Sequence, residues 1–418
     1  MKKTLRAGII ATGSELLWDG IPETHSLFLA DRLGELGFEV VHKSVVGDDE
    51  RLMADALRRA ASRTQLVIIT GGLGPTEDDV TRKVISRVTR RRLVLQEKLL
   101  EQIKKRYADY KQPMPAGNAR QALMPARARV VPNPTGTAPG LMLHWENCTL
   151  VALPGVGSEM RTMFMKTVRP YLEHRFPSRP VVESRVLRTF GLSESLVNER
   201  LAGFLIGHPQ VRIGMTAKTS GVDVRIRVTG RTRQDVHGLL GEIYPEISDR
   251  LSDITYSAKG EDMERVVGRL LAGKGRRVAV AESCTGGLIG HRLTNIPGSS
   301  EYVDRVTVCY SDQSKTDLLN VPAELIRKNG AVSAPVAGAM ARGIRQGAKT
   351  DFGLAVTGIA GPGGGSPEKP VGLVFFGWDD GRETWTGFKQ FSGDREAIKA
   401  RAAQFALNLL RERLLQSD

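Results

Sequence analysis

The chain has 418 residues, of which 41% are hydrophobic and 25% are charged, so it can form two or three ordinary globular domains. It has no apolar run of membrane-spanning length, and the run AGIIA near its start is too short for a signal peptide. The three cysteines, Cys148, Cys284 and Cys309, show no zinc-ligand or CxxC spacing, so we expect reduced thiols and a cytoplasmic location.

The net charge of +14 is concentrated in the first 260 residues, which carry +11, whereas residues 261–418 carry +3. The densest basic run is RVTRRR at 87–92. Such a run could contact nucleic acid or a nucleotide phosphate. No aromatic residues alternate with it, so we favour a solvated basic helix face and do not expect a nucleic-acid partner.

Residues 1–172 alternate short apolar runs with amphipathic segments. Such repeats predict a doubly wound parallel sheet with helices on both faces, whose ligands bind at the carboxyl ends of the strands. We expect strands over residues 5–12, 38–43 and 65–70, and helices over residues 26–36 and 51–63.

Residues 180–252 predict a small α+β module, preceded by the Pro-bearing linker FPSRP at 176–180. No GxxG loop is placed for clamping nucleic acid, so we interpret the module as a spacer or a dimerisation unit. We expect strands over residues 183–190, 211–218 and 223–230, and helices over residues 195–205 and 233–251.

Residues 260–418 predict a second α/β domain, in which small-residue loops follow several strands and would form a pocket. The most informative loop is AESCTGG at 281–287. We expect strands over residues 276–282, 306–310, 352–357 and 372–378, and helices over residues 263–275, 334–346 and 394–418.

The loop TGGLGPTEDDVTR at 70–82 follows an expected strand. Its glycines would let backbone N–H groups approach a phosphate, and Thr76 is the expected N-cap of the next helix. Its carboxylates either complement the helix dipole or, with those of neighbouring loops, hold a divalent cation. The candidates are Gly71, Gly72, Gly74, Thr76 and Gly136 for the substrate, and Glu15, Asp48, Asp78 and Asp79 for the metal.

In AESCTGG, Ser283 is a candidate nucleophile if a base lies nearby. A lysine can serve as that base, and Lys315 is best placed, just beyond the strand bearing Tyr310, which could relay the proton or position the ammonium. Cys284 is the rival, but no histidine lies in these loops, and His291 is expected to face away. Alternatively, Ser283 is an N-cap, Lys315 a solvated loop lysine and Tyr310 a tyrosine at the edge of the core.

The stretches TGGLGPTEDDVTR, NPTGTAPG and LPGVGSEM closely resemble the molybdopterin-binding-like domain of the competence/damage-inducible CinA family. The resemblance implies an ADP-ribose pyrophosphatase activity that depends on a divalent metal. The family usually shows Asp-Thr-Asn where this chain has Glu23-Thr24-His25, and proline in place of Gly157. We expect these departures to affect hydrolysis more than the fold.

The stretches ESCTGG, YSDQSK, GAVS and TGIAGPGGGSPEKPVG resemble the C-terminal CinA domain, which also occurs alone as nicotinamide-nucleotide amidase. The resemblance implies hydrolysis of nicotinamide mononucleotide (NMN) to nicotinate mononucleotide and ammonia, without a cofactor. It makes Ser283 the nucleophile and Tyr310 and Lys315 catalytic. The expected substrate-binding residues are Thr285, Gly286, Gly287, Thr357, Gly358, Gly361 and Arg395, with Arg395 a candidate for the phosphate.

The turn Thr285–Gly287, at the start of the next helix, is expected to supply the backbone N–H groups that stabilise the oxyanion. Two other functions stay open: a ligand-binding protein whose N-terminal domain does not turn over its ligand, and a competence-associated accessory protein. A homodimer is expected from the resemblance alone.

Overall fold

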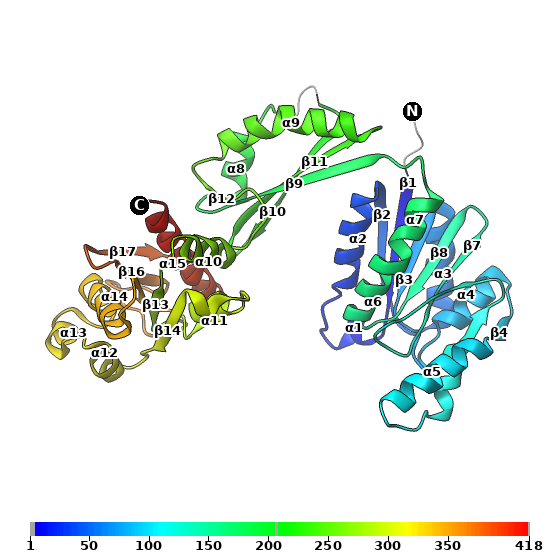
Figure 1. Cartoon of the computed structure of the whole chain (residues 1–418), viewed down its shortest axis with the longest axis horizontal. Coiled ribbons are helices and arrows are strands. Elements are labelled where there is room, and N and C mark those ends of the chain that lie inside the picture. Colours follow the sequence, from blue (N-terminus) through cyan, green and yellow to red (C-terminus); the bar gives the residue numbers. More distant parts are fainter. Residues whose placement is uncertain (1–4, 205–207, 417–418) are drawn as a thin grey trace. The chain divides into compact units, whose positions relative to one another are not determined.

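The computed structural model describes residues 5–204 and 208–416. The chain divides into two compact units, Met1–Glu183 with Val228–Leu240 and Ser184–Arg227 with Gly241–Asp418, and each is described by itself (Figure 1). Two of the expected helix ends, at Leu205 and Asp418, lie outside the described residues.

The first unit is built on a six-stranded sheet, in the order β2 (Phe38–Val46), β1 (Leu5–Thr12), β3 (Leu66–Thr70), β8 (Cys148–Leu153), β7 (Gly140–Trp145) and β6 (Arg129–Val131). The first four strands are parallel, which confirms the predicted parallel sheet. The last two strands pair in antiparallel fashion, and β6, β7 and β8 were not among the predicted strands. Two residues, Glu146 and Asn147, join β7 to β8, and Glu146 adopts a left-handed φ of 52°, as tight hairpin turns require.

Helices cover both faces of this sheet, as predicted, because its central strands are hydrophobic on both sides (Figure 1). Ile10 and Val67 pack with helices on one face, and Ile9 and Ile68 with helices on the other. The first face carries α3 (Glu50–Arg63), α4 (Thr81–Thr89) and α5 (Glu97–Asp109), and the second α2 (His25–Glu35), α6 (Gly157–Met163), η2 (Phe164–Val168) and α7 (Arg169–Arg175). The remaining elements are α1 (Glu15–Trp18), η1 (Ala116–Ala122) and a hairpin of β4 (Leu93–Leu95) and β5 (Leu123–Pro125).

The central module contains a four-stranded sheet of the order β10 (Val211–Lys218), β11 (Gly221–Gly230), β9 (Val181–Thr189) and β12 (Thr255–Ser257). Its helices are α8 (Glu194–Arg200) and α9 (Arg233–Arg250). Strands occur where they were expected in this part of the chain. The helix expected from residue 195 begins one residue earlier and ends at Arg200.

The C-terminal sheet has the order β14 (Val303–Val308), β13 (Val278–Glu282), β15 (Phe352–Gly358), β16 (Leu373–Asp379) and β17 (Thr384–Gln390). β13 is buried along its length and parallel to both β14 and β15, so the carboxyl ends of these three strands meet at one edge. β16 and β17 continue the sheet in antiparallel fashion. The loops singled out in the sequence therefore emerge beside one another.

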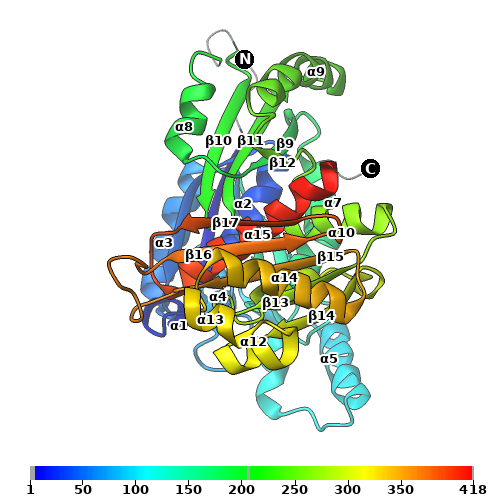
Figure 2. The same ribbon diagram turned by 90° about the vertical axis from the view of Figure 1, so that its left-hand side faces the viewer.

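Helices also cover both faces of the C-terminal sheet. Val280 and Val356 pack toward one helical layer, whereas Ala281 and Ala355 pack toward the other. The first layer consists of α10 (Met263–Gly273), α11 (Leu288–Thr294) and α15 (Arg395–Gln416). The second consists of α12 (Asp312–Leu319), α13 (Ala323–Asn329) and α14 (Ala334–Ala348), which lie in front of the strands in Figure 2. A short η3 (Ser299–Glu301) precedes β14.

Candidate active site

Ser283 and Lys315 lie within hydrogen-bonding distance of one another. Ser283 follows the last residue of β13, and Lys315 lies in the first turns of α12, with its Nζ 3.3 Å from Ser283 Oγ. The side chain of Lys315 is only 1% exposed, although it carries an amine. The alternative of a solvated loop lysine is therefore wrong, since Lys315 is buried in a helix. Ser283 is also not an N-cap, because that position of α11 is held by Gly287.

Backbone carbonyls hold the amine of Lys315 from the other side. Its Nζ donates to the carbonyl oxygens of Cys309 at 3.0 Å, Tyr310 at 3.2 Å and Ser311 at 3.4 Å. A neutral amine has two N–H bonds, which two of these carbonyls can accept, and one lone pair. In that form the lone pair is free to face the Ser283 hydroxyl, which is the arrangement that a general base requires.

Tyr310 lies beyond the end of β14 and its side chain is 62% exposed, so it is neither on the strand nor at the edge of the core. Its hydroxyl accepts a hydrogen bond from Arg395 Nη2 at 2.9 Å, and Arg395 Nη1 donates to the Gly361 carbonyl at 2.6 Å. Only the backbone carbonyl of Tyr310 accepts from Lys315 among the bonds described. The structure thus supports a role in positioning the amine, and not the relay of a proton through the phenol.

A cavity of about 200 Å³ lies over the pair. Thr357, at the end of β15, donates from Oγ1 to the Ala331 carbonyl at 2.9 Å and so ties β15 to the loop before α14. Of the residues expected to bind substrate, Thr357, Gly358 and Arg395 line the cavity, whereas Thr285, Gly286, Gly287 and Gly361 lie outside its lining. The lining residues are Ser283, Cys284, Tyr310, Asp312, Lys315, Ala331, Val332, Thr357, Gly358, Ala360 and Arg395.

The turn after Ser283 does not supply the oxyanion donors as expected. Gly286 N donates to the Ser283 carbonyl at 3.1 Å, and Gly287 N donates to Glu282 Oε2 at 3.0 Å. Both amides are occupied, so their predicted role is wrong. The Thr285 amide has no acceptor among the described residues, and Thr285 is fully buried outside the lining of the cavity. Glu282 belongs to the motif ESCTGG, but the sequence predicted no role for it.

Cys284 lines the same cavity but is a poor nucleophile. Burial raises the pKa of its thiol to about 12, so the thiol is protonated at neutral pH. His291 lies on α11 with its side chain exposed and its Nε2 bonded to Asn295 Nδ2 at 3.0 Å. No histidine lines the cavity, and the serine is therefore the better nucleophile.

A larger cavity, of about 520 Å³, lies at the carboxyl ends of the parallel strands in the first unit. It brings together all four predicted metal ligands, Glu15, Asp48, Asp78 and Asp79, together with the predicted phosphate contacts Gly71, Gly72, Gly74 and Thr76. Sequence reasoning missed Glu159, another lining carboxylate, which stands in LPGVGSEM and accepts from Asn133 Nδ2 at 2.6 Å.

The carboxylate of Asp79 holds the glycine loop in place. It accepts from Gly74 N at 2.7 Å and from Thr76 N at 2.8 Å and Oγ1 at 2.6 Å. Arg82, whose pKa burial lowers to about 10, donates to the Leu73 and Gly74 carbonyls from the other side. Thr76 was predicted to cap the next helix, which is wrong because α4 begins at Thr81 with Val80 before it.

These carboxylates do not form a ready metal site. Asp48 accepts from Ser14 N at 2.8 Å, as Asp79 does from its own loop. Within residues 5–204 and 208–416, no group of three or more His, Cys, Asp or Glu side chains is arranged to hold a metal ion. The present arrangement therefore does not fit a preformed divalent site, and metal binding there stays a prediction.

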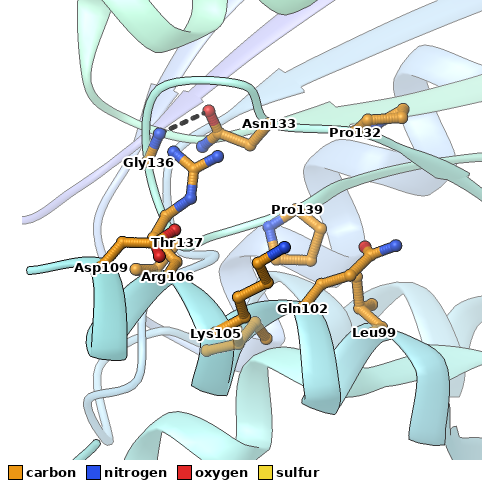
Figure 3. A pocket seen from close by; sticks show the side chains of 11 residues that line it. Leu99, Gln102, Lys105, Arg106, Asp109, Pro132, Asn133, Gly136, Thr137 and Pro139 are labelled. Carbon is orange, nitrogen blue, oxygen red and sulfur yellow. Dashed lines mark hydrogen bonds between the residues drawn. The ribbon is translucent and has the colours of Figure 1, made fainter. Parts of the chain in front are cut away.

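A third cavity, of about 310 Å³, lies between α5 and the loop NPTGTAPG (Figure 3). Gly136 lines this cavity and not the larger one, whereas Thr137 lines both. Asn133 Oδ1 accepts from Gly136 N at 2.8 Å and shapes the loop that separates the two cavities. Lys105 and Arg106 give the third cavity a basic wall on α5.

The two departures from the family pattern meet in the structure. A Cβ added to Gly157, the first residue of α6, would lie 3.2 Å from His25 Nε2 at the start of α2. Burial lowers the pKa of His25, with Arg161 contributing to the shift. Glycine at 157 thus makes room for the larger imidazole at 25, so the two substitutions are linked by packing.

Three family profiles match successive parts of the chain. The family described as "Probable molybdopterin binding domain" matches residues 8–174, "Damage-inducible protein CinA KH domain" residues 184–257 and "CinA C-terminal domain" residues 260–414. The KH description was not foreseen from the sequence, since the only GxxG spacing in that segment, at 238–241, lies inside α9. In the described part of the chain, none of the helices combines the length and apolar character needed to cross a membrane.

Relatives match along the whole chain. A CinA-like protein from Geobacter metallireducens is 41% identical and covers 98% of this chain and 100% of its own. One from Dictyoglomus thermophilum is 40% identical, again over 98% and 100%. The crystal structure of competence damage-inducible protein A from Klebsiella pneumoniae is 36% identical over 37% of this chain and 97% of its own, with a TM-score of 0.37. With about 40% identity along its length, the chain belongs to the CinA family of competence/damage-inducible proteins.

Proposed function

We propose that the C-terminal domain hydrolyses the carboxamide of NMN, giving nicotinate mononucleotide and ammonia. The observation that carries this proposal is the buried amine of Lys315, 3.3 Å from Ser283 Oγ beside a cavity at the sheet edge. A serine next to a lysine base is a recognised arrangement for acyl transfer. The resemblance of the surrounding motifs to nicotinamide-nucleotide amidase suggests the acyl group.

The reaction then follows from amide chemistry. Neutral Lys315 takes the proton of Ser283, whose Oγ attacks the carboxamide carbon to form a tetrahedral intermediate. The C–N bond breaks while the Lys315 ammonium returns the proton to the departing nitrogen, which leaves as ammonia. Water, deprotonated by Lys315, attacks the resulting ester, and the bond between the acyl carbon and Ser283 Oγ breaks as the serine regains its proton.

Arg395 and Asp312 line the cavity with opposite charges, and two further cations, Lys369 and Lys399, lie near it without lining it. Arg395 donates to a carbonyl and a hydroxyl, and Lys369 Nζ donates to the carbonyls of Asn329 and Val332 at 2.8 and 2.7 Å. Lys399, one turn after Arg395 on α15, lies with its Nζ 3.5 Å from the Cβ position of Gly286. None of these three cations has a carboxylate partner among the described residues, so their field is available to a substrate phosphate.

The test is ammonia release by the purified full chain from NMN, nicotinamide riboside and nicotinamide. The three share the carboxamide, but only NMN carries a phosphate. Rapid release from NMN, with a much lower kcat/KM for the riboside and for nicotinamide, is the expected result. Absence of release from NMN by folded protein would refute the proposed activity.

For the first unit we propose binding of ADP-ribose, with hydrolysis of its pyrophosphate as the stronger form of the proposal. The supporting observation is the cavity of about 520 Å³, in which glycine loops and five carboxylates gather at the ends of parallel strands. Calorimetric titration with ADP-ribose, with and without Mg²⁺ or Mn²⁺, tests binding, and AMP release tests turnover. Binding without turnover would support a ligand-binding protein, and no binding at all would refute both forms.

An accessory role in competence would require DNA binding. Its only support in the sequence is the net charge of +11 on the first 260 residues. A steeply salt-dependent affinity for duplex DNA would favour that function, whereas weak binding that does not depend on salt would exclude it.

A further inference from the structure

The carboxylate of Glu282 is fully buried directly before the candidate nucleophile. It ends β13 with 0% exposure. Its Oε2 accepts from Gly287 N at 3.0 Å and from Ile289 N at 3.1 Å, and its Oε1 accepts from Gly290 N at 2.8 Å. Three amides at the start of α11 thus donate to one side chain from the preceding strand.

The backbone of Glu282 is linked to the other half of the pair. Cys309 N donates to the Glu282 carbonyl at 2.8 Å, and the Cys309 carbonyl accepts from Lys315 Nζ at 3.0 Å. Lys315 Nζ in turn lies 3.3 Å from Ser283 Oγ. A closed ring of bonds therefore runs from Glu282 through Cys309 and Lys315 to Ser283, and back along the chain.

The turn that follows Ser283 depends on the same carboxylate. Gly286 and Gly287 adopt left-handed φ values of 63° and 92°, which only glycine takes up readily. With this backbone conformation the Gly287 amide donates to the Glu282 carboxylate, and the Gly286 amide donates to the Ser283 carbonyl. Without the carboxylate, two buried amides and the partly buried Gly287 amide would lose their acceptor, and the turn would rearrange to satisfy them.

We propose that Glu282 is a positioning residue, whose carboxylate fixes the turn 283–287 and thereby holds Ser283 Oγ on the amine of Lys315. The inference rests on the proposed serine–lysine chemistry but assigns a role to a residue that does not touch the substrate cavity. It also explains why the start of α11 cannot act as the oxyanion hole, since Glu282 already occupies those amides.

The experiment compares Glu282→Gln and Glu282→Asp with the wild-type full chain. The glutamine keeps the shape but has one acceptor oxygen, so at least one of the three amides loses its bond. A displacement of Ser283 on the order of 1 Å costs up to about 100-fold in rate. We expect kcat for NMN to fall about 30-fold or more in Glu282→Gln with KM nearly unchanged, and to recover partly in Glu282→Asp.

Asp379, at the end of β16, provides the matched control. It is another buried carboxylate of the same domain, 3% exposed, and it accepts from Arg345, Thr384 and Gly381 N outside the cavity. Asp379→Asn is expected to lower the melting temperature and leave kcat unchanged. Equal losses of kcat in both folded variants would overturn the proposal, because they would show only a general effect of destabilisation.

Inactivation by an alkyl fluorophosphonate supplies a second readout, which needs an activated Ser283 but no nucleotide. The proposal predicts that Glu282→Gln slows inactivation as much as it lowers kcat. If the wild type releases no ammonia from NMN, the proposed function fails, and the inactivation rates still decide the role of Glu282. If folded Glu282→Gln is inactivated at the wild-type rate, the proposed positioning role is overturned. If this variant does not fold, Glu282→Asp decides by the same criterion, and failure of both to fold would overturn a role specific to positioning.

Discussion

Cys284 and Ser283 are neighbours in the chain and line the same cavity, yet their chemistry differs because of their surroundings. The serine hydroxyl faces the amine of Lys315, whereas the thiol is buried in the apolar core with Val280 and Ile289. A thiol needs ionisation to react, and burial opposes it. A serine needs only a base at the moment of attack, and the structure provides one.

This difference predicts the response to alkylation. Burial raises the pKa of Cys284 and Cys148 to about 12 and also raises that of Cys309. In folded protein at pH 8, only about one thiol in 10,000 is ionised at a pKa of about 12. Iodoacetamide, followed by mass spectrometry of each cysteine, should label the folded chain far more slowly than the denatured chain. Labelling of folded Cys284 at the denatured rate would contradict the burial of this thiol.

The same shift has a consequence for stability. A thiol whose pKa is higher in the folded state stabilises the fold fully below its unfolded pKa of about 8.5. That contribution is lost as the pH rises toward 12, because only the unfolded chain gains the thiolate. Free energies of unfolding should therefore fall between pH 8 and pH 10, and less so in Cys284→Ala. An equal fall in both proteins would contradict a contribution from Cys284.

Lys399 is a second candidate, besides the expected Arg395, for binding the substrate phosphate. In Lys399→Gln we expect KM for NMN to rise about tenfold, equivalent to about 1.4 kcal/mol of lost binding, with kcat nearly unchanged. The kcat/KM for nicotinamide riboside should not change, since it carries no phosphate. Lys389→Gln, an exposed lysine on β17, is the control. A parallel loss for NMN and the riboside would show that Lys399 does not contact the phosphate.

The residue patterns indicated Ser283 and Lys315 as candidate site residues, and the family resemblance indicated Arg395, but neither predicted their environment. The stretch SDQSKTDLL has no apolar periodicity that would predict a buried lysine. The loop after β14 and the end of β13, which the fold brings to its amine, surround Lys315 with carbonyls and with Ser283. The role of Glu282 was missed because a glutamate at the end of a strand can be solvent-exposed, paired with a cation or bonded to backbone amides, and the sequence does not distinguish these cases. Its three amide partners come into view only once the backbone of the turn is known.

At the scale of elements, the close contact between α14 and β15 depends on glycine. A Cβ on Gly353 would lie 2.1 Å from the backbone carbonyl oxygen of Ala341 on α14. Such a contact is too short, and a backbone atom cannot turn aside as a flexible side chain can. The helix therefore packs directly on the strand whose end carries Thr357. Ala331 and Val332, in the loop before α14, line the same cavity as Thr357.

Gly353→Ala is expected to destabilise the C-terminal domain by about 3 kcal/mol, because backbone would have to move. Gly347, also on α14, has open space around its Cβ position, so Gly347→Ala should stabilise by about 0.5–1 kcal/mol through helix propensity. Calorimetric melting of the two variants checks both signs. A melting temperature for Gly353→Ala equal to that of the wild type would contradict the close contact.

The elements themselves were largely predictable. The central parallel strands and α14 follow hydrophobic patterns and a serine–proline helix start, and they lie close to their expected bounds. Strands β6, β7 and β8 were missed, because β6 has only three residues and β7 and β8 are short strands joined by a two-residue turn, which gives little periodicity. The predicted start of α4 was also wrong. The Thr76 hydroxyl donates to Asp79 within a loop, and the helix begins at Thr81.

At the scale of the whole molecule, the chain contains two sites that share no residue. The larger cavity is lined entirely by residues from Thr12 to Glu159, and the cavity over Ser283 and Lys315 by residues from Ser283 to Arg395. The residues that line each cavity therefore come from one unit alone. Both proposed substrates derive from pyridine nucleotides, which gives a chemical reason for finding the two sites in one chain.

Independence of the two sites is directly testable. Ser283→Ala should abolish ammonia release and leave the affinity for ADP-ribose unchanged. Asp79→Asn should weaken ADP-ribose binding, because the loop Gly74–Thr76 loses an acceptor, and should leave ammonia release unchanged. Calorimetry and an ammonia assay on both full-length variants decide the question. Loss of both activities in either folded variant would contradict independent sites.

The central claim is that Ser283 and Lys315 together hydrolyse an amide. The most direct measurement is ammonia release from NMN by the wild type, Ser283→Ala and Lys315→Met, with His291→Ala as a control for a histidine base. We expect release by the wild type and His291→Ala, and a loss of at least about 1,000-fold in the other two variants while they stay folded. Ammonia release at the wild-type rate by folded Ser283→Ala or Lys315→Met would contradict the serine–lysine mechanism.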